Sequence, residues 1–161
     1  LDGAWLPEPW ASRLVLDAGA KVLVDERSLW PGGRFLTTHL VVSTRFLEEH
    51  PQTVEALLRA NLDSIDWIGA HRAEAQQVVN DQIAEASGKP LSGPVIGRAF
   101  AGIEVTSDPL AGTLPRLLSD GVTAGVTRRA SLTGIYDLRL LNKVLQEKGR
   151  PPVSAAGLGE D

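Results

Sequence analysis

The chain has 161 residues, of which 43% are hydrophobic and 22% charged, with a formal net charge of −4 at pH 7. This length predicts one globular unit with its own core, and the interspersed charges argue against a patch that binds nucleic acid or a membrane surface. The absence of cysteine excludes a disulfide framework, a thiolate nucleophile and a cysteine-based zinc cluster.

The sequence contains no methionine, so Leu1 is not expected to be a natural translation start. The chain is therefore expected to be a piece of a longer polypeptide. No apolar run approaches the roughly 20 residues that a membrane span needs, and the N-terminus lacks the basic and apolar segments of a signal peptide. An export signal, if the parent protein has one, is expected upstream.

The opening stretch DGAWLPEPWASR, residues 2–13, places two of the four tryptophans beside a carboxylate. Pro7 and Pro9 restrict φ and bias the residue before each of them towards extended backbone, which predicts a stiff loop. Pro9 can also be an early position of a helix that continues from Trp10, because the first turn leaves its N–H groups unpaired anyway. The plain interpretation is that the tryptophans are half-buried packing residues and that the helix dipole favours Glu8 near the helix start.

Three β-rich runs of strand length are expected to form strands. They are KVLVDE (21–26), FLTTHLVVS (35–43) and GIEVTSD (102–108). Helices are expected where apolar residues recur every three or four positions. They cover residues 10 to about 18 before Gly19, 51 to about 68, about 72–86, 93–101, about 109–124 and 135–149. An interior Pro115 argues against an unbroken helix at that place, and Asp137 is expected to cap the last helix.

This pattern predicts a helix-rich α/β fold with a few strands. A few strands with long helices cannot make a balanced layer alone, so the chain is expected to complete a sheet that begins elsewhere. The tail from Arg150, with its prolines and small residues, is expected to be disordered.

The sequence offers no catalytic constellation. His39, His50 and His71 include no pair at the i, i+4 spacing of a helical metal site, and we interpret all three as surface or capping residues. No G-x-S-x-G elbow or phosphate-binding glycine loop is present. We therefore expect no enzyme activity, no catalytic residue, no metal and no cofactor.

Several motifs together carry a resemblance over residues 2 to about 147. They are DGAWLPEPW, KVLVDE, TTHLVVSTRFLEEHPQTVEALLRANLDSIDWI, RAEAQQVV and GIYDLRLLNKVL. In this order and spacing they resemble the C-terminal half of the solute-binding proteins of ABC importers for aliphatic sulfonates, taurine and nitrate. The resemblance implies part of a type II periplasmic-binding-protein fold, in which two α/β lobes hold a ligand in the cleft between them.

The resemblance also implies an organisation for the chain. Residues 1–34 correspond to the end of the second lobe, 35–45 to a crossover segment, 46–149 to helices of the first lobe and 150–161 to the disordered tail. A missing N-terminal half would supply most of the first lobe's sheet. The implied partners are that half, an ABC permease in the membrane and a small anionic solute, but no nucleic acid.

In the family that the chain resembles, the loop near the start faces the cleft. Trp5, Glu8, Pro9 and Trp10 are therefore candidate ligand contacts, with Thr37 and Thr38 as hydroxyl donors. Because an oxyanion needs donors, Glu8 is expected to orient a donor or cap a helix rather than touch the anion. Trp5 could stack on the organic part of a ligand or on a cation. Arg34, the positive charge nearest to the crossover, is expected to be solvated.

The function implied is binding of a small organic or inorganic anion, by an exported periplasmic or cell-surface protein such as a lipoprotein. Without the partner half, we expect weak or no binding of alkanesulfonates, and self-association into a homo-oligomer through exposed apolar surface. Two alternatives stay open. One is an enzyme of the same fold or a binder of thiamine-pyrimidine precursors, and the other is a ligand-free interaction fragment.

Overall fold

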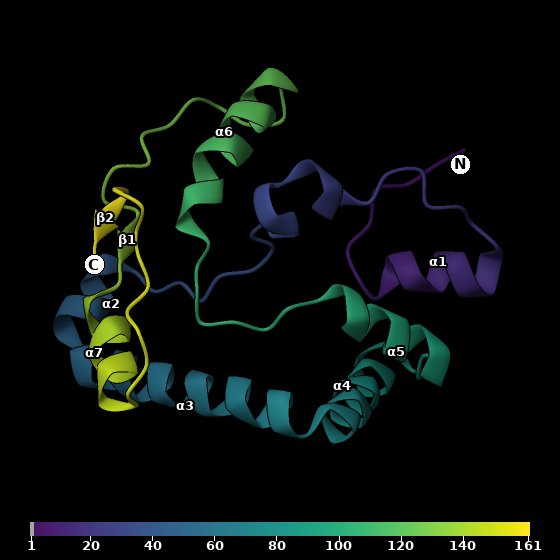
Figure 1. Ribbon diagram of the computed structural model, residues 1–161, viewed down its shortest axis with the longest axis horizontal. Helices are drawn as coiled ribbons and strands as arrows, with labels where there is room; N and C mark the ends of the chain where they lie inside the picture. Colours follow the sequence, from purple (N-terminus) through teal and green to yellow (C-terminus); the bar gives the residue numbers. More distant parts are fainter. Residues whose placement is uncertain (1) are drawn as a thin grey trace. The chain divides into compact units, whose positions relative to one another are not determined.

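A computed structural model describes residues 2–161 and is rich in helix (Figure 1). The helices are α1 (Trp10–Ala18), α2 (Thr44–Glu49), α3 (Pro51–Ala70), α4 (Arg72–Ser87), α5 (Gly93–Gly102), α6 (Leu114–Thr123) and α7 (Arg139–Glu147), with short 3-10 turns η1 (Glu26–Leu29), η2 (Pro31–Gly33) and η3 (Ala111–Thr113). The strands are β1 (Tyr136–Asp137) and β2 (Gly159–Glu160), which pair in parallel. Within residues 2–161, no helix has both the length and the apolar character that crossing a membrane requires.

The chain divides into two compact units. Unit 1 contains residues up to 25 together with 64–105, and unit 2 contains residues 26–63 together with 106–161. Each unit is described by itself.

Several helices begin near a proline or end at a glycine, as the sequence predicts. Helix α1 ends at Gly19, whose φ of 68° is the left-handed conformation that a C-terminal glycine adopts without steric cost. Pro51 opens α3, and Pro115 lies in the first turn of α6, where its missing N–H costs nothing. The helix expected over 109–124 therefore starts later, at Leu114, after the 3-10 turn η3.

The three predicted strands are wrong. Residues 21–25, 34–43 and 103–108 have no regular secondary structure, and η1 begins at Glu26. Their apolar side chains are largely solvent-exposed, as with Leu23 at 95%. A β-rich run becomes a strand only when a neighbouring strand accepts its backbone hydrogen bonds, and no such neighbour pairs with these runs in the described part of the chain.

Unit 1 packs α5 against both α1 and α4. Its core contains Leu91, Val95 and Ile96, with Ile83 and Phe100 packed around them. The Arg72 guanidinium of α4 donates to the Phe100 carbonyl oxygen and lies 5.8 Å from the centre of the Phe100 ring.

Unit 2 has its core where α7, the β1–β2 pair and η3 meet. The buried residues are Ala111, Tyr136, Leu138 and Ala155, with Leu114, Leu141, Val153 and Leu158 packed against them. Helix α7 is also linked to the first part of α3, because Glu55 accepts hydrogen bonds from Lys143 at 2.6 Å and Arg59 at 2.7 Å. These two bonds, that from Lys143 foremost, lower the pKa of the Glu55 carboxyl.

The C-terminal tail differs from its expected disorder. Ala155 is fully buried, and β2 pairs with β1 so that Tyr136 stands opposite Gly159. The Leu138 N–H donates to the Glu160 carbonyl oxygen at 2.8 Å. The tail is ordered because its few apolar residues complete the core of unit 2. The start of the helix expected over 135–149 moves to Arg139 for the same reason, since Tyr136 and Asp137 form β1.

The same side-chain clamp recurs in both units. Asn142 of α7 donates to the Val153 carbonyl oxygen at 2.9 Å and accepts from the Val153 N–H at 2.8 Å. Asn80 of α4 makes the equivalent two bonds with Leu91, both at 2.8 Å, across the same separation of 11 residues. Each asparagine amide thus ties the segment after its helix back onto that helix.

Replacing Asn142 with alanine is expected to lower the free energy of unfolding by about 1–3 kcal/mol, because it leaves the Val153 N–H and C=O without their partner. Urea titration followed by circular dichroism measures the change. Asn61→Ala is the matched control, because Asn61 is exposed on α3 and should change the free energy of unfolding by less than about 0.5 kcal/mol. Equal losses in the two variants would show that the clamp does not stabilise the tail.

Candidate functional site

The loop before α1 is held to the helix by Glu8. Its Oε2 accepts a hydrogen bond from the Ser12 N–H at 3.0 Å, which satisfies one of the N–H groups that a helix start leaves unpaired. The aliphatic part of Glu8 lies against the end of α5, since a Cβ at Gly102 would be 3.6 Å from Glu8 Cγ. The expectation that Glu8 caps a helix is confirmed.

The two tryptophans of this loop and helix are both exposed. Trp5 is 71% exposed, whereas Trp10 lines a depression of about 500 Å³ on the surface of α1. The other lining residues are Leu6, Arg13, Leu14, Asp17 and Ala18. Arg13 Cζ lies 6.0 Å from the centre of the Trp10 ring and Arg13 Nε lies 3.7 Å from Asp17 Oδ2. An exposed ion pair of this length is weak, so the guanidinium can exchange its partner for an anionic ligand beside an aromatic face.

Pro9 is half-buried and completes the turn that leads into α1; the Glu8–Pro9 peptide bond is cis. The structure therefore gathers four of the sequence-predicted site residues, Trp5, Glu8, Pro9 and Trp10, at one junction of loop and helix in unit 1. Thr37 and Thr38 belong to unit 2.

Thr37 and Thr38 are exposed on an irregular segment that runs beside residues 108 and 109. On one side of them, Arg34 Nη1 lies 3.9 Å from Asp108 Oδ2. On the other, His39 Nε2 lies 3.0 Å from the Pro109 carbonyl oxygen. The segment that carries Thr37 and Thr38 is therefore attached on both sides to the turn at residues 108 and 109, through Arg34 and through His39. Arg34 is 41% exposed, so it keeps contact with solvent as expected, and its guanidinium also lies near the Asp108 carboxylate.

His39 has a structural role in this arrangement. Besides the Pro109 carbonyl, its Nε2 lies 3.2 Å from Tyr136 Oη, and the two rings meet edge to face at 5.5 Å. Burial raises the pKa of the Tyr136 phenol, which keeps it protonated and uncharged. The pair fixes the segment of Thr37 and Thr38 to the core of unit 2.

A stacked aromatic cluster holds the start of the same segment. The Trp30 ring stacks on the Phe35 ring, with the ring centres 5.6 Å apart, and the Arg116 guanidinium of α6 lies 4.6 Å from the centre of the Trp30 ring. Glu26 Oε1 accepts the Trp30 indole N–H at 2.5 Å. Because Trp30 and Phe35 flank Arg34 in the chain, these contacts restrict where the Arg34 backbone lies.

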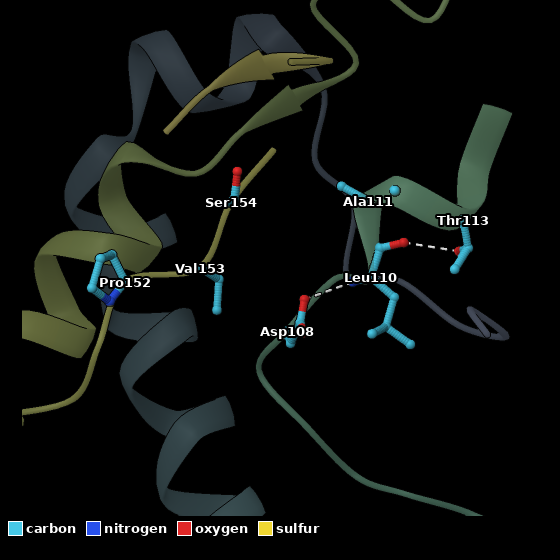
Figure 2. Close-up of a pocket in the computed structure, with 8 residues that line it drawn as sticks. Asp108, Leu110, Ala111, Thr113, Pro152, Val153 and Ser154 are labelled. Carbon is cyan, nitrogen blue, oxygen red and sulfur yellow. Dashed lines mark hydrogen bonds between the residues drawn. The ribbon is translucent and has the colours of Figure 1, made fainter. Parts of the chain in front are cut away.

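An open surface depression of about 370 Å³ lies next to Asp108 (Figure 2). It is lined by Asp108, Leu110, Ala111, Gly112, Thr113, Pro152, Val153 and Ser154. Asp108 Oδ1 accepts from the Leu110 N–H at 2.9 Å, and Thr113 Oγ1 donates to the Leu110 carbonyl oxygen at 2.8 Å. These bonds hold Leu110 in the left-handed region, at φ 49°, a conformation that costs a non-glycine residue about 1–3 kcal/mol and that is concentrated at binding sites.

Sequence reasoning did not identify Asp108 as a site residue. The run Ser107-Asp108-Pro109 is a turn signal, but a turn signal does not say which distant segment the turn will meet. Across residues 2–161, no group of three or more His, Cys, Asp or Glu side chains is placed to hold a metal ion.

In unit 2, Thr37 and Thr38 are exposed on a segment where Arg34 lies near Asp108. In unit 1, Trp5 and Trp10 are exposed around the start of α1. A model of the NMT1-like family matches residues 1–84, just over half of the chain. The chain belongs to the NMT1-like family. This membership fits an α/β fold and a ligand-binding role, and it is consistent with the periplasmic-binding-protein superfamily. No curated protein and no solved structure matches the chain.

Proposed function

We propose that the chain is a solute-binding component of an ABC importer and binds a small anion, such as an aliphatic sulfonate, taurine or nitrate, in a cleft between two lobes. The observation that carries the proposal is the family match, because its range contains all six candidate contacts, Trp5, Glu8, Pro9, Trp10, Thr37 and Thr38. In this proposal the protein acts outside the cytoplasmic membrane, delivers its solute to a membrane permease and catalyses no reaction.

The donor groups support an anionic solute. Oxyanions are bound by O–H, N–H and guanidinium donors. Thr37 and Thr38 supply exposed hydroxyls within a few residues of the Arg34 guanidinium, and Arg13 supplies a second guanidinium beside Trp10. The exposed face of Trp5 offers an apolar surface for an alkyl group. Glu8 is engaged as a helix cap, which directs its charge towards the Ser12 N–H.

The test is an NMR titration of the 161-residue chain with ethanesulfonate, taurine and nitrate, at ionic strength matched with sodium chloride. At least one of these solutes should shift the backbone amides of residues 34–39 saturably, with weak affinity. Thr37→Val with Thr38→Val should weaken binding by at least about 2–10-fold, because each neutral hydrogen bond that is lost has an effect of about that size.

Thr53→Val is the matched control, because Thr53 is exposed on α3 and its replacement should leave the titration unchanged. Shifts no larger than those caused by chloride, for all three solutes, would refute the proposed function.

A further inference from the structure

The segment between α6 and β1 carries two adjacent cations that have no partner. It covers residues 124–135 (Figure 1), where the backbone forms turns and irregular structure. Arg128 and Arg129 are both exposed, and in the part of the chain that the structure describes neither guanidinium has an ion pair or a hydrogen bond. The chain has no acidic residue between Asp120 and Asp137. Two cations are fewer than the cluster of about four to eight that binds a membrane surface, so an acidic protein groove is the better fit.

A serine hydroxyl follows the two arginines closely along the chain. Ser131 is exposed, and its Oγ accepts a hydrogen bond from the Thr133 N–H at 3.2 Å. Within residues 2–161 the hydroxyl donates to no other group. In an extended chain, two and three residues span about 7 and 10 Å, so a partner can hold both guanidiniums while the hydroxyl is presented to it. The apolar Leu132 comes next, which completes the run Arg128-Arg129-Ala130-Ser131-Leu132.

The backbone around this hydroxyl can be drawn into an extended conformation. At one end the segment is tied to α6, because the Thr127 N–H donates to the Gly121 carbonyl oxygen at 3.2 Å. At the other end the Ile135 N–H donates to the Leu132 carbonyl oxygen at 3.2 Å. Between these points, residues 128–131 make no backbone hydrogen bond within the described chain. A segment with so few bonds opens locally while the rest of the fold persists.

A second exposed serine shows what this segment adds. Ser119 also has an arginine three residues before it, Arg116, but both lie in α6. The Ser119 carbonyl oxygen accepts the Thr123 hydroxyl at 2.9 Å, and Arg116 Nε lies 3.4 Å from Asp120 Oδ2. The helix prevents an extended conformation, and an acid already faces the guanidinium. Ser131 therefore combines unpaired charges with a backbone that a partner can extend, and Ser119 does not.

We infer that Ser131 is a phosphorylation site for a protein kinase with an acidic substrate groove. Kinases select substrates by the charges beside the acceptor hydroxyl, and carboxylates of the groove bind Arg128 and Arg129. Ser131 Oγ attacks the γ-phosphorus of a nucleoside triphosphate, the bond from that phosphorus to the bridging oxygen breaks, a carboxylate of the kinase takes the hydroxyl proton, and the nucleoside diphosphate leaves. The inference does not depend on the proposed function. Because nucleoside triphosphates are held in the cytoplasm, the transfer precedes export.

Phosphorylation is expected to order the segment. A phosphoserine carries a charge of about −1.5 to −2 at pH 7 and three strong acceptor oxygens. These oxygens can accept from the two guanidiniums and from the Thr133 N–H, which already donates to Ser131 Oγ. Hydrogen exchange of the Thr133 amide should therefore slow by about tenfold, the effect of one charge-assisted hydrogen bond.

The test incubates the full 161-residue chain with magnesium ATP and a purified kinase of this class, the catalytic subunit of cyclic-AMP-dependent protein kinase. Mass spectrometry with peptide mapping should find one phosphate, on Ser131. Ser131→Ala should abolish it, and Ser119→Ala, the matched control on α6, should leave it unchanged. Replacing Arg128 and Arg129 with alanine should lower kcat/KM by at least about tenfold for each charge lost. The unfolding midpoint should stay the same, because both side chains are exposed.

Several results would overturn the site. One is the absence of phosphate on Ser131, or phosphate mainly on another residue. Another is an equal rate in the arginine variant and the unchanged chain, because accessibility alone would then explain the transfer. A rate that rises with the unfolded fraction in Leu145→Ala would show that only the unfolded chain is a substrate. If no phosphate is transferred and the two arginines instead hold the chain to phosphatidylserine vesicles, their partner is a membrane and the site is refuted. None of these results bears on solute binding, so the proposed function is tested separately.

Discussion

Replacing Gly159 with alanine is expected to detach the C-terminal tail from the core of unit 2. An alanine Cβ at this position would lie 1.8 Å from the Tyr136 carbonyl oxygen, far inside van der Waals contact, so β2 could not stay paired with β1. The free energy of unfolding should fall by about 2–3 kcal/mol, from forced displacement and lost backbone hydrogen bonds. Hydrogen exchange should show the same change locally, because the Leu138 N–H loses its acceptor, the Glu160 carbonyl.

Gly112→Ala serves as the matched control within the same unit. A Cβ at Gly112 would meet the Ala156 Cβ at 3.9 Å, which is ordinary contact. It should leave Leu138 exchange unchanged. Unaltered exchange of the Leu138 N–H in Gly159→Ala would show that the β1–β2 pair does not hold the tail.

Truncation of Leu145 to alanine is expected to have the largest effect on stability. Leu145 is 1% exposed in α7, so its removal loses the buried apolar surface and leaves a cavity. Such substitutions cost about 2–5 kcal/mol. Urea unfolding followed by circular dichroism should show a lower midpoint.

The matched control for Leu145 is Leu57→Ala on α3. Leu57 is 43% exposed, so its truncation should cost less than about 1 kcal/mol. Similar losses for Leu57 and Leu145 would mean that burial in unit 2 does not decide the cost.

The helices could be read from the sequence because their causes are local. A spacing of three or four residues between apolar side chains defines α3, and Gly88 ends α4 with a φ of 78° that glycine adopts readily. These features act within one or two turns of the chain. The start of the last helix was misplaced because Tyr136 and Asp137 pair with residues of the tail instead.

The strands could not be read in the same way, because a strand is stabilised by its neighbour. The runs around Leu23 and Val41 have the composition of strands, yet both side chains are exposed on irregular backbone. Conversely, Gly159 and Glu160 form a strand without any β-rich composition. Pairing, rather than propensity, decided both results.

The residues of the candidate site also differ in whether the sequence alone could identify them. Thr37 and Thr38 were identified from a resemblance in sequence, and their role as ligand donors stays a prediction. Asp108 was missed, because its importance depends on contact with a segment 70 residues away, shown by the bond between His39 and Pro109. No local pattern encodes a contact over that distance.

The sequence alone thus determined the positions of most helices, the cap at Glu8 and the likeness to a family of binding proteins, because each depends on short-range order along the chain. The folded chain decided that the tail is part of the core, that Asn80 and Asn142 clamp the segments after their helices, and that Asp108 stands beside Arg34. These results depend on which distant surfaces fit together. Packing selects those partners through buried area and satisfied hydrogen bonds, which are properties of pairs of segments and not of either one.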